Sequence, residues 1–278
     1  MDLSVIIVSW NVKEKLKHNL EALYNSEGDF KFEVFVVDNN SEDGSVEMVQ
    51  ENFPNVQIIR NLDNLGFAKA NNQAIKLATG DFILLLNPDM QVNQSTLLKS
   101  WDWAKQNKQA TVTGIKLFNE DGSLVKQVRR FPKLFDQLMI VLKLPHLFPQ
   151  LLNEYLCNNF DYTQASKVDS IRGAFFLINL ENYKKLSGLD KPSLDERYFI
   201  WFEEVDFCRQ VHKLGGEVWY TPVAECLDYV GQSFKQVKKN KTQKYFSDSM
   251  LAYFRKWENP IEAKVLAVAW KAVGLIVR

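Results

Sequence analysis

Residues 80–89 read GDFILLLNPD, and this stretch decides the fold. Its apolar run FILLL is too short for a buried helix and too unbroken for a half-exposed strand, which is typical of a central parallel strand covered on both faces. Pro88 has no N–H for a sheet ladder and disfavours the helical conformation at Asn87, so the strand ends there. Asp89 then follows the carboxyl end of a strand, where open α/β sheets bind ligands. The alternative is an ordinary turn aspartate.

Strands and helices alternate regularly around this stretch. Apolar patterning predicts strands over residues 3–10, 32–37 and 56–60, and helices over 12–25 and 66–79. A further helix would begin after Ser41 or Asp43, either of which could cap it, and end at about Asn52. We expect Gly80 to end the last of these helices, as C-terminal glycines do. Such alternation predicts an α/β fold with a parallel, doubly wound sheet flanked by helices.

Composition limits the classes of function. The 278 residues are 46% hydrophobic, enough for one large domain or two small ones. Basic and acidic residues number 34 each, which gives no overall support for a nucleic-acid partner. The three cysteines lack metal-site spacing and favour a reducing compartment, so we expect a cytoplasmic protein. We expect neither a signal peptide nor a membrane span, because the apolar runs are too short.

Polar side chains suited to a nucleotide follow four successive strands. No G-x-G-x-x-G follows the first strand, and no P-loop sequence occurs. Asp38 can accept a hydrogen bond from the imide N–H of uracil or thymine, and asparagine amides can both donate and accept. The strand ends carry Ser9 and Asn11, then Asp38, Asn39 and Asn40, then Asn61, Asp63 and Asn64, then Asn87 and Asp89. Together these predict a nucleotide site, although each alone is typical of a turn.

Seven segments then occur in a recognisable order. They are VSWN at 8–11, VDNNSEDG at 37–44, NLGFAKANN at 64–72, LLNPD at 85–89, RGAFFLI at 172–178, LDERYF at 194–199 and FEEVDFC at 202–208. This set resembles the family 2 inverting glycosyltransferases, most closely their rhamnosyltransferase-like branch. The resemblance implies a GT-A fold, a UDP- or dTDP-sugar donor with dTDP-rhamnose first, and a divalent cation, Mg²⁺ or Mn²⁺. It also implies a saccharide or lipid-linked acceptor in cell-envelope polysaccharide synthesis.

The resemblance also implies a division of the chain. Residues 1–235 would form the GT-A domain, with a nucleotide-sugar binding half at 1–115 and an acceptor-binding and catalytic half at 116–235. Residues 236–278 would form a helical tail. The donor would be bound by Ser9, Asn11, Asp38, Asn40, Asn64, Gly66, Asn71, Asn87 and Asp89.

The implied metal site departs from the family pattern. Asp89 aligns with the last Asp of the family's D-x-D motif, and Asn87 replaces the first. Asp228 stands where the family carries a metal-binding histidine. An oxygen ligand there still suits Mg²⁺ or Mn²⁺, so we assign the metal to Asp89 and Asp228. The alternative is a weakened site.

Glu203 and Glu204 match the family's Glu-Asp pair at the start of a helix. Glu204 shares an inward stripe with Cys208 and Val211, at i, i+4 and i+7, while Glu203 lies about 100° away. We therefore predict Glu204 as the catalytic base. Burial would raise its pKa and the helix N-terminus would lower it. Alternatively, the pair is simply favoured at a helix N-terminus.

Three other acids of this region are assigned to the acceptor. Asp206 would contact the acceptor or orient the loop, and Asp195 and Glu203 would bind the acceptor sugar. Residues 129–165 either form a variable loop that meets the acceptor or a helical flap on the core.

The segment from Pro260 to Arg278 has apolar residues near helical spacing, with Lys264, Lys271 and Arg278 among them. It predicts an amphipathic helix that lies on an anionic membrane, giving peripheral contact at the inner face of the cell membrane. A helix packed on the body and a homodimer interface are the alternatives. A basic cluster would assist membrane contact: Lys235, Lys238, Lys239, Lys241 and Lys244.

Two rival functions remain open. A sugar nucleotidyltransferase would carry a glycine-rich, basic loop after the first strand, and Trp10 to Lys13 do not supply one. A nucleotide-sugar binding protein with impaired catalysis is the other, suggested by Asn87, Gln210 and Asp228.

Overall fold

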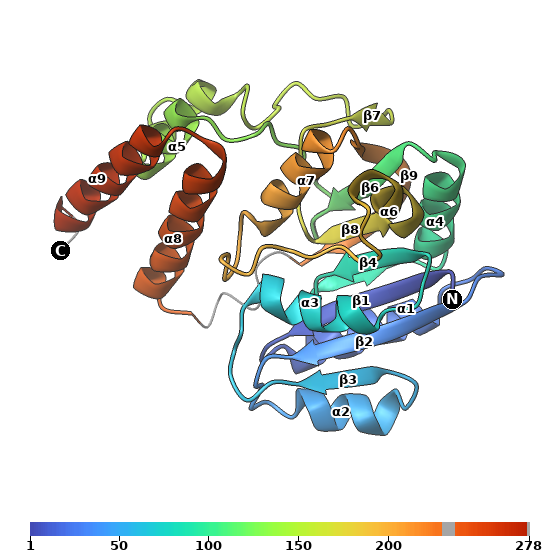
Figure 1. Ribbon diagram of the computed structural model, residues 1–278. Helices are drawn as coiled ribbons and strands as arrows, with labels where there is room; N and C mark the ends of the chain where they lie inside the picture. The colour runs from blue at the N-terminus through green and yellow to red at the C-terminus, as the bar shows by residue number, and fades with distance from the viewer. Residues whose placement is uncertain (230–236, 277–278) are drawn as a thin grey trace.

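The chain folds as one sheet with helices on both faces (Figure 1). The computed structural model describes residues 1–229 and 237–276. In this part of the chain nine strands form a single sheet, in the order β3-β2-β1-β4-β8-β6-β9-β5, with β7 beside β9. The expected α/β class is confirmed.

The first half is the predicted alternation of strands and helices. Its elements are β1 (Leu3–Ser9), α1 (Lys13–Tyr24), β2 (Phe32–Asp38), α2 (Ser45–Asn52), β3 (Gln57–Arg60), α3 (Phe67–Leu77) and β4 (Phe82–Leu86). β1 pairs in parallel with β2 and β4, and β2 pairs in parallel with β3. Every residue of β4 is buried, as its unbroken apolar run predicts. The carboxyl ends of these four strands therefore meet at one edge.

The second half makes the sheet mixed. Its elements are β5 (Met90–Val92), α4 (Thr96–Gln106), β6 (Ala110–Phe118), α5 (Leu134–Val141), η1 (Leu144–His146), η2 (Pro149–Leu152), β7 (Ser166–Lys167), β8 (Phe175–Asn179), α6 (Leu180–Ser187), α7 (Glu203–Lys213), β9 (Glu217–Asp228), α8 (Lys239–Trp257) and α9 (Pro260–Ile276). β8 is antiparallel to β4 and β6, and β5 and β7 are antiparallel to β9. Besides β6 with β9, the predicted parallel pairing is thus limited to the first four strands.

Alternate residues of β1 enter two separate apolar cores. Leu3, Val5 and Ile7 pack with α1, α2 and α4 on one face of the sheet. Ile6 and Val8 pack with α3, α6 and α7 on the other. β1 and β4 are buried at every position, and their residues are apolar except for Ser4 and Ser9 of β1, as expected of strands that are covered on both faces.

Gly80 has a different role from the predicted helix stop. α3 already ends at Leu77, and the following Ala78 is in an extended conformation. Gly80 instead lies against β1, where its N–H donates to Ser4 Oγ at 2.9 Å. A Cβ at this position would lie 2.6 Å from the Ser4 nitrogen. The glycine is therefore required by close packing of two backbones.

A third apolar core joins α5 to the C-terminal helices. Val141 of α5, Tyr253 of α8 and Leu266 of α9 are buried together with Tyr198 and Phe202. Residues 129–165 thus contain a helical flap, and the tail packs on the body with one face, as the alternatives for both segments predicted. Lys235 and Arg278 of the predicted basic segments lie outside the described residues.

Candidate active site

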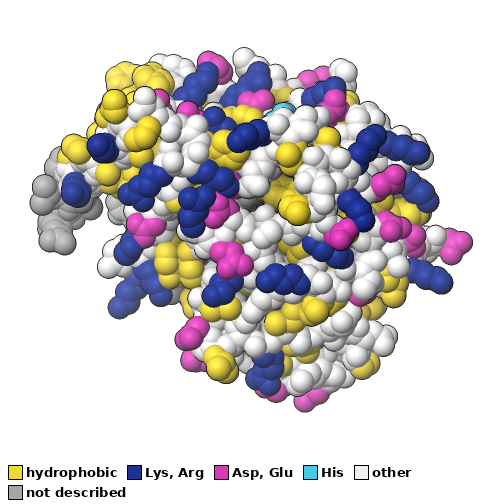
Figure 2. All heavy atoms as spheres, in the orientation of Figure 1, with side chains coloured by type: hydrophobic (Ala, Val, Ile, Leu, Met, Phe, Trp, Pro, Cys, Tyr) yellow, Lys and Arg dark blue, Asp and Glu magenta, His cyan; other side chains and the backbone are white. Residues whose placement is uncertain are grey.

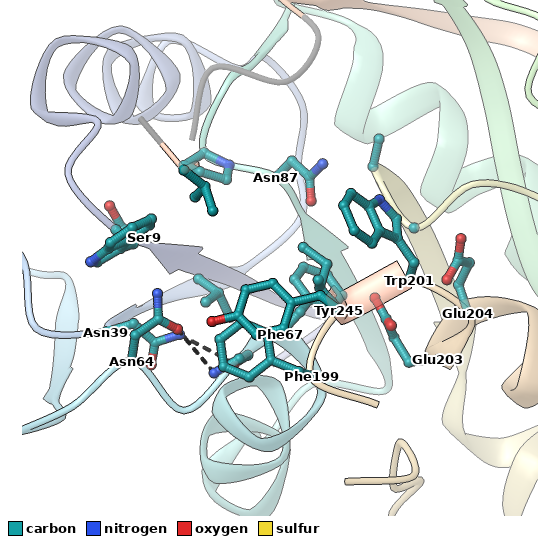
Figure 3. A pocket seen from close by; sticks show the side chains of 18 of the residues that line it. Ser9, Asn39, Asn64, Phe67, Asn87, Phe199, Trp201, Glu203, Glu204 and Tyr245 are labelled. Atoms are coloured by element: carbon teal, nitrogen blue, oxygen red, sulfur yellow. Dashed lines mark hydrogen bonds between the residues drawn. The ribbon is translucent and has the colours of Figure 1, made fainter. Parts of the chain in front are cut away.

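A cavity of about 470 Å³ opens at the carboxyl ends of β1, β2 and β4. Strand ends, the start of α7 and the start of α8 contribute its walls (Figure 3). Its polar and aromatic lining includes Ser9, Trp10, Asn39, Asp63, Asn64, Asn87, Asp89, Arg172, Phe199, Trp201, Glu203, Glu204, Lys241 and Tyr245. The predicted ligand site at the edge of the parallel strands therefore exists as a cavity.

One wall of the cavity is built around Gly66. Its N–H donates to Asn64 Oδ1 at 3.0 Å, and its carbonyl accepts from Asn39 Nδ2 at 3.2 Å. Gly66 has a φ of +82°, and a Cβ there would lie 2.3 Å from the Phe199 carbonyl oxygen. Only glycine fits this conformation and this contact. Asn64 and Gly66 thus lie where the sequence predicted, and Asn39 lines the cavity in place of Asn40.

Four predicted donor-site residues do not line the cavity. Asn11 Oδ1 accepts from the Glu42 N–H at 2.7 Å, and Asn40 is exposed in the same loop region. Asn71 is completely buried in α3 and donates to the Phe67 carbonyl at 2.9 Å. Asn11 and Asn71 thus bind backbone groups of the protein, a competing use of amide side chains that spacing alone does not separate from ligand binding.

Asp38 is the fourth, and it lies beside the cavity. One of its oxygens accepts from the Ser41 N–H at 3.0 Å. Asp38 pairs in the sheet with Ser9, which does line the cavity. The second Asp38 oxygen and Ser9 Oγ are buried without a hydrogen-bond partner among the described residues. Buried polar atoms of this kind require a partner, so a ligand group or water is expected here.

The two predicted metal ligands lie near each other in the sheet, because Asp228 pairs with Met90, the neighbour of Asp89. Asp89 lines the cavity and is 5% exposed. Asp228 is buried at the end of β9, where the Arg172 guanidinium donates to it at 3.1 Å, and it does not line the cavity. No cluster of three ligating His, Cys, Asp or Glu side chains occurs in the described part of the chain. Asp89 with diphosphate oxygens still fits Mg²⁺, which is commonly held by one or two carboxylates and substrate phosphates.

Glu203 and Glu204 both lie in the cavity wall (Figure 3). Both side chains therefore reach the cavity, although successive residues lie about 100° apart around a helix. The two residues that precede α7, Trp201 and Phe202, adopt positive φ values of 63° and 70°. Such conformations are uncommon for large side chains, and here they turn the chain sharply into α7.

The two glutamates differ in electrostatics. Burial raises the pKa of Glu203 well above its usual range, and the charge of Glu204 raises it further. Burial also raises the pKa of Glu204, so it outweighs the backbone N–H groups at the helix start. The positive charge of Arg172 acts in the opposite direction on Glu204. The Arg172 guanidinium therefore favours the ionised form of Glu204, against the effect of burial.

Sequence comparison decides the family. The profile of glycosyl transferase family 2 matches residues 4–168. The chain belongs to this family. The uncharacterized glycosyltransferase YfnE of Bacillus subtilis is 36% identical over 242 residues, which cover 77% of this chain and 61% of YfnE. The N-acetylglucosaminyl-diphospho-decaprenol L-rhamnosyltransferase of Mycobacterium tuberculosis is 26% identical over 213 residues, 72% of this chain and 67% of that protein.

The chain therefore spans less than two thirds of the length of YfnE. Among solved structures, it resembles the mannosyltransferase PcManGT of Pyrobaculum calidifontis in complex with GDP-Man and Mn²⁺. The two share 16% identity and a TM-score of 0.59, over 98% of this chain and 69% of PcManGT. The predicted GT-A fold is confirmed. The family profile ends before α7, so the roles of Glu203 and Glu204 depend on their geometry.

Several residues that line the cavity were not predicted from the sequence. Phe199 and Tyr245 stack with ring centroids 4.1 Å apart, and Lys241 Nζ lies 5.7 Å from the centre of the Tyr245 ring. Lys241 and Tyr245 belong to α8, in the segment expected to be a separate tail. Arg172 was part of a matched segment without an assigned role. The sequence signal that could have indicated a role for α8 is the spacing of Lys241 and Tyr245. They lie four residues apart and therefore on one face of a helix.

Two predicted acceptor residues, Asp195 and Asp206, do not line the cavity. Asp206 is 0% exposed and accepts from Lys256 Nζ at 2.7 Å, Trp257 Nε1 at 2.5 Å and Tyr198 Oη at 3.1 Å. Hydrogen bonds from Arg197, and then Lys256, hold the pKa of Asp195 well below its usual range. Both acids therefore anchor α7 and the loop before it to α8.

We expect Asp206→Asn to lower the free energy of unfolding by about 2 kcal/mol, because the charged hydrogen bonds to Asp206 are lost. Lys256 keeps its ion pair with Asp195 in this variant. Urea denaturation measures the change. The matched control is Asp248→Asn. It removes an exposed ion pair between Asp248 and Lys244, both on α8, and should leave the urea midpoint unchanged. Equal midpoints for Asp206→Asn and wild type would contradict the anchoring role.

Proposed function

We propose that this glycosyltransferase moves a sugar with inversion from a UDP- or dTDP-sugar to a saccharide or lipid-linked acceptor in cell-envelope polysaccharide synthesis. The observation that carries the proposal is that Asp89 and Glu204, from the end of β4 and the start of α7, line one cavity. dTDP-rhamnose is the first candidate donor, because one relative is a named L-rhamnosyltransferase with a diphospho-decaprenol acceptor. The reducing compartment that the cysteines favour would place the enzyme at the cytoplasmic face of the membrane.

The donor would sit along the ends of the parallel strands. The uncommitted oxygen of Asp38 suits the imide N–H of a uracil or thymine ring, and Ser9 Oγ beside it can donate or accept. Asp89 would hold a divalent cation whose charge offsets that of the departing diphosphate. Asp228 would support the cation and diphosphate site indirectly, by holding the Arg172 guanidinium at the cavity wall.

Glu204 would act on the acceptor. As the acceptor oxygen forms its bond to the anomeric carbon, its proton passes to the Glu204 carboxylate. The bond from the anomeric carbon to the diphosphate breaks, and its electron pair leaves with the phosphate oxygen. The positive charge of Arg172 favours the ionised form of Glu204, which is the form that accepts the proton. The Phe199–Tyr245 stack offers an aromatic face against which a sugar ring can lie.

We propose that α8 works with residues 1–235 as one catalytic unit. Lys241 and Tyr245 line the same cavity as the strand ends, so a chain cut at residue 235 would lose part of its wall. The remaining tail, α9, would then be the part that lies outside the catalytic unit.

A panel of nucleotide sugars tests the proposal. The full chain is incubated with Mn²⁺ and dTDP-rhamnose, UDP-glucose, UDP-GlcNAc or GDP-mannose, and release of nucleoside diphosphate is measured with and without lipid-linked saccharide acceptors. We expect release from a pyrimidine donor, stimulated by an acceptor. Pyrophosphate exchange with a nucleoside triphosphate would instead indicate a nucleotidyltransferase. Tight binding without turnover across the panel would indicate a binding protein.

A further inference from the structure

α9 is apolar on two opposite faces. Ala263, Leu266 and Val273 are buried against α5 and α8. Successive residues turn by about 100° around a helix, so Ile261, Val265 and Val268 share the face directly opposite. These three are 65%, 38% and 67% exposed. One face of the helix thus accounts for its attachment to the body, and the other has no packing role in the described structure.

The exposed apolar surface continues onto the neighbouring flap. α5 packs beside α9 (Figure 1). Exposed apolar side chains follow on α5 and on the turns after it. Figure 2 shows hydrophobic side chains gathered over this end of the molecule. We name this surface the α5–α9 face, and define it by Phe135, Leu142, Leu147, Phe148, Ile261, Val265 and Val268. Large contiguous apolar patches mark sites that bind a protein or a membrane.

The charges that border the face are basic. Lys264 and Lys271 are exposed along one edge of the outer face of α9. Arg255 and Lys264 also flank a groove of about 220 Å³ between α8 and α9, whose remaining walls are Pro260, Ala263 and Ala267. Of the acids on α5 and α9, Asp136 is buried and Glu262 is half-buried. The face therefore combines an apolar centre with a cationic edge.

We propose that the α5–α9 face binds the surface of a bilayer rich in anionic phospholipids, with α9 lying flat at the headgroup level. Apolar side chains on one face with lysines along its border are typical of interfacial helices. No helix in residues 1–229 and 237–276 is long and apolar enough to cross a bilayer, so the contact is peripheral. A two-fold dimer through this face would bring lysines of one copy near those of the other, which anionic lipid avoids.

The face also has a useful position relative to the cavity. α8 begins with Lys241 and Tyr245 in the cavity wall and ends at Trp257, next to α9. Sixteen residues of helix separate Lys241 from Trp257, a rise of roughly 24 Å. If the acceptor is lipid-linked, which rests on the proposed function, α8 holds the catalytic cavity at a fixed distance from the membrane that carries the acceptor.

Vesicle sedimentation with the full chain tests the proposal. We expect strong binding to phosphatidylcholine vesicles that contain phosphatidylglycerol, and weak binding to phosphatidylcholine alone. Ile261→Glu with Val268→Glu should reduce binding at least tenfold, and Lys264→Gln with Lys271→Gln by about fivefold for each lysine removed. The matched controls are Leu189→Glu, an exposed leucine on another face, and Lys99→Gln, and both should bind like wild type.

The readout is independent of catalysis, so Glu204→Gln should also sediment like wild type. Failure of the sugar-transfer assay would leave this result in place. Absence of binding to both vesicle types would overturn the proposal, as would wild-type binding by both double variants. A dimer in light scattering that Ile261→Glu with Val268→Glu converts to a monomer, without vesicle binding, would assign the face to a second copy of the chain.

Discussion

Glu204→Gln should abolish measurable sugar transfer, with kcat reduced by about 10³-fold, while the affinity for the nucleotide stays within about twofold. The amide has nearly the same shape as the carboxylate but cannot accept the proton of the acceptor hydroxyl. Glu204 lies at the start of α7, away from the strand ends where the nucleotide would bind. Steady-state kinetics with the best donor of the panel, and calorimetric titration with its nucleoside diphosphate, measure the two effects.

Glu203→Gln is the matched comparison, since it changes the adjacent carboxylate in the same wall. Burial and the neighbouring charge of Glu204 both raise the pKa of Glu203, which disfavours the ionised form that a base requires. We expect this variant to keep most of its kcat. If Glu203→Gln loses transfer and Glu204→Gln retains it, the base is Glu203 instead.

The pH profile adds a second check on the base. The base works deprotonated, and burial raises the pKa of Glu204. In the wild type, kcat/KM should therefore fall with decreasing pH from a higher value than an ordinary glutamate would give. Arg172→Met should move this fall to still higher pH, because the cation that favours the ionised form is removed.

Those elements of the fold could be predicted whose position follows from a local pattern of apolar residues. The nearly continuous apolar runs of β1 and β4 predicted both strands to within a residue or two, because a strand buried on two faces has few polar positions. The antiparallel place of β8 between β4 and β6 could not be predicted. Phe175–Asn179 is equally apolar, and its direction depends on contacts nearly 100 residues apart along the chain.

The site could be predicted where the strand ends themselves form it. Ser9, Asn64, Gly66, Asn87 and Asp89 follow strands and line the cavity. Asn11 follows the same strand as Ser9 but binds the backbone of Glu42, and its sequence position alone does not distinguish this role from ligand binding.

Contacts between distant elements gave no such signal. Asp206 has the spacing of a site residue on α7, yet its partners Lys256 and Trp257 come from α8. Nothing local distinguishes an acid that binds a sugar from one that binds another helix. For the same reason, Lys241 and Tyr245 were assigned to a tail rather than to the cavity.

Asp89→Asn should remove the dependence of nucleotide binding on the cation. We expect wild-type affinity for the nucleoside diphosphate to rise at least tenfold with Mn²⁺, and the variant to bind weakly with or without it, since an amide is a poorer ligand for a hard cation than a carboxylate. Asp81→Asn is the matched control, because Asp81 is exposed at the opposite end of β4. Calorimetry with and without Mn²⁺ measures both. A Mn²⁺ response in Asp89→Asn equal to that of Asp81→Asn would remove Asp89 from the metal site. The cation would then need another ligand at the cavity, and Asp228, held by Arg172, would be the first to substitute.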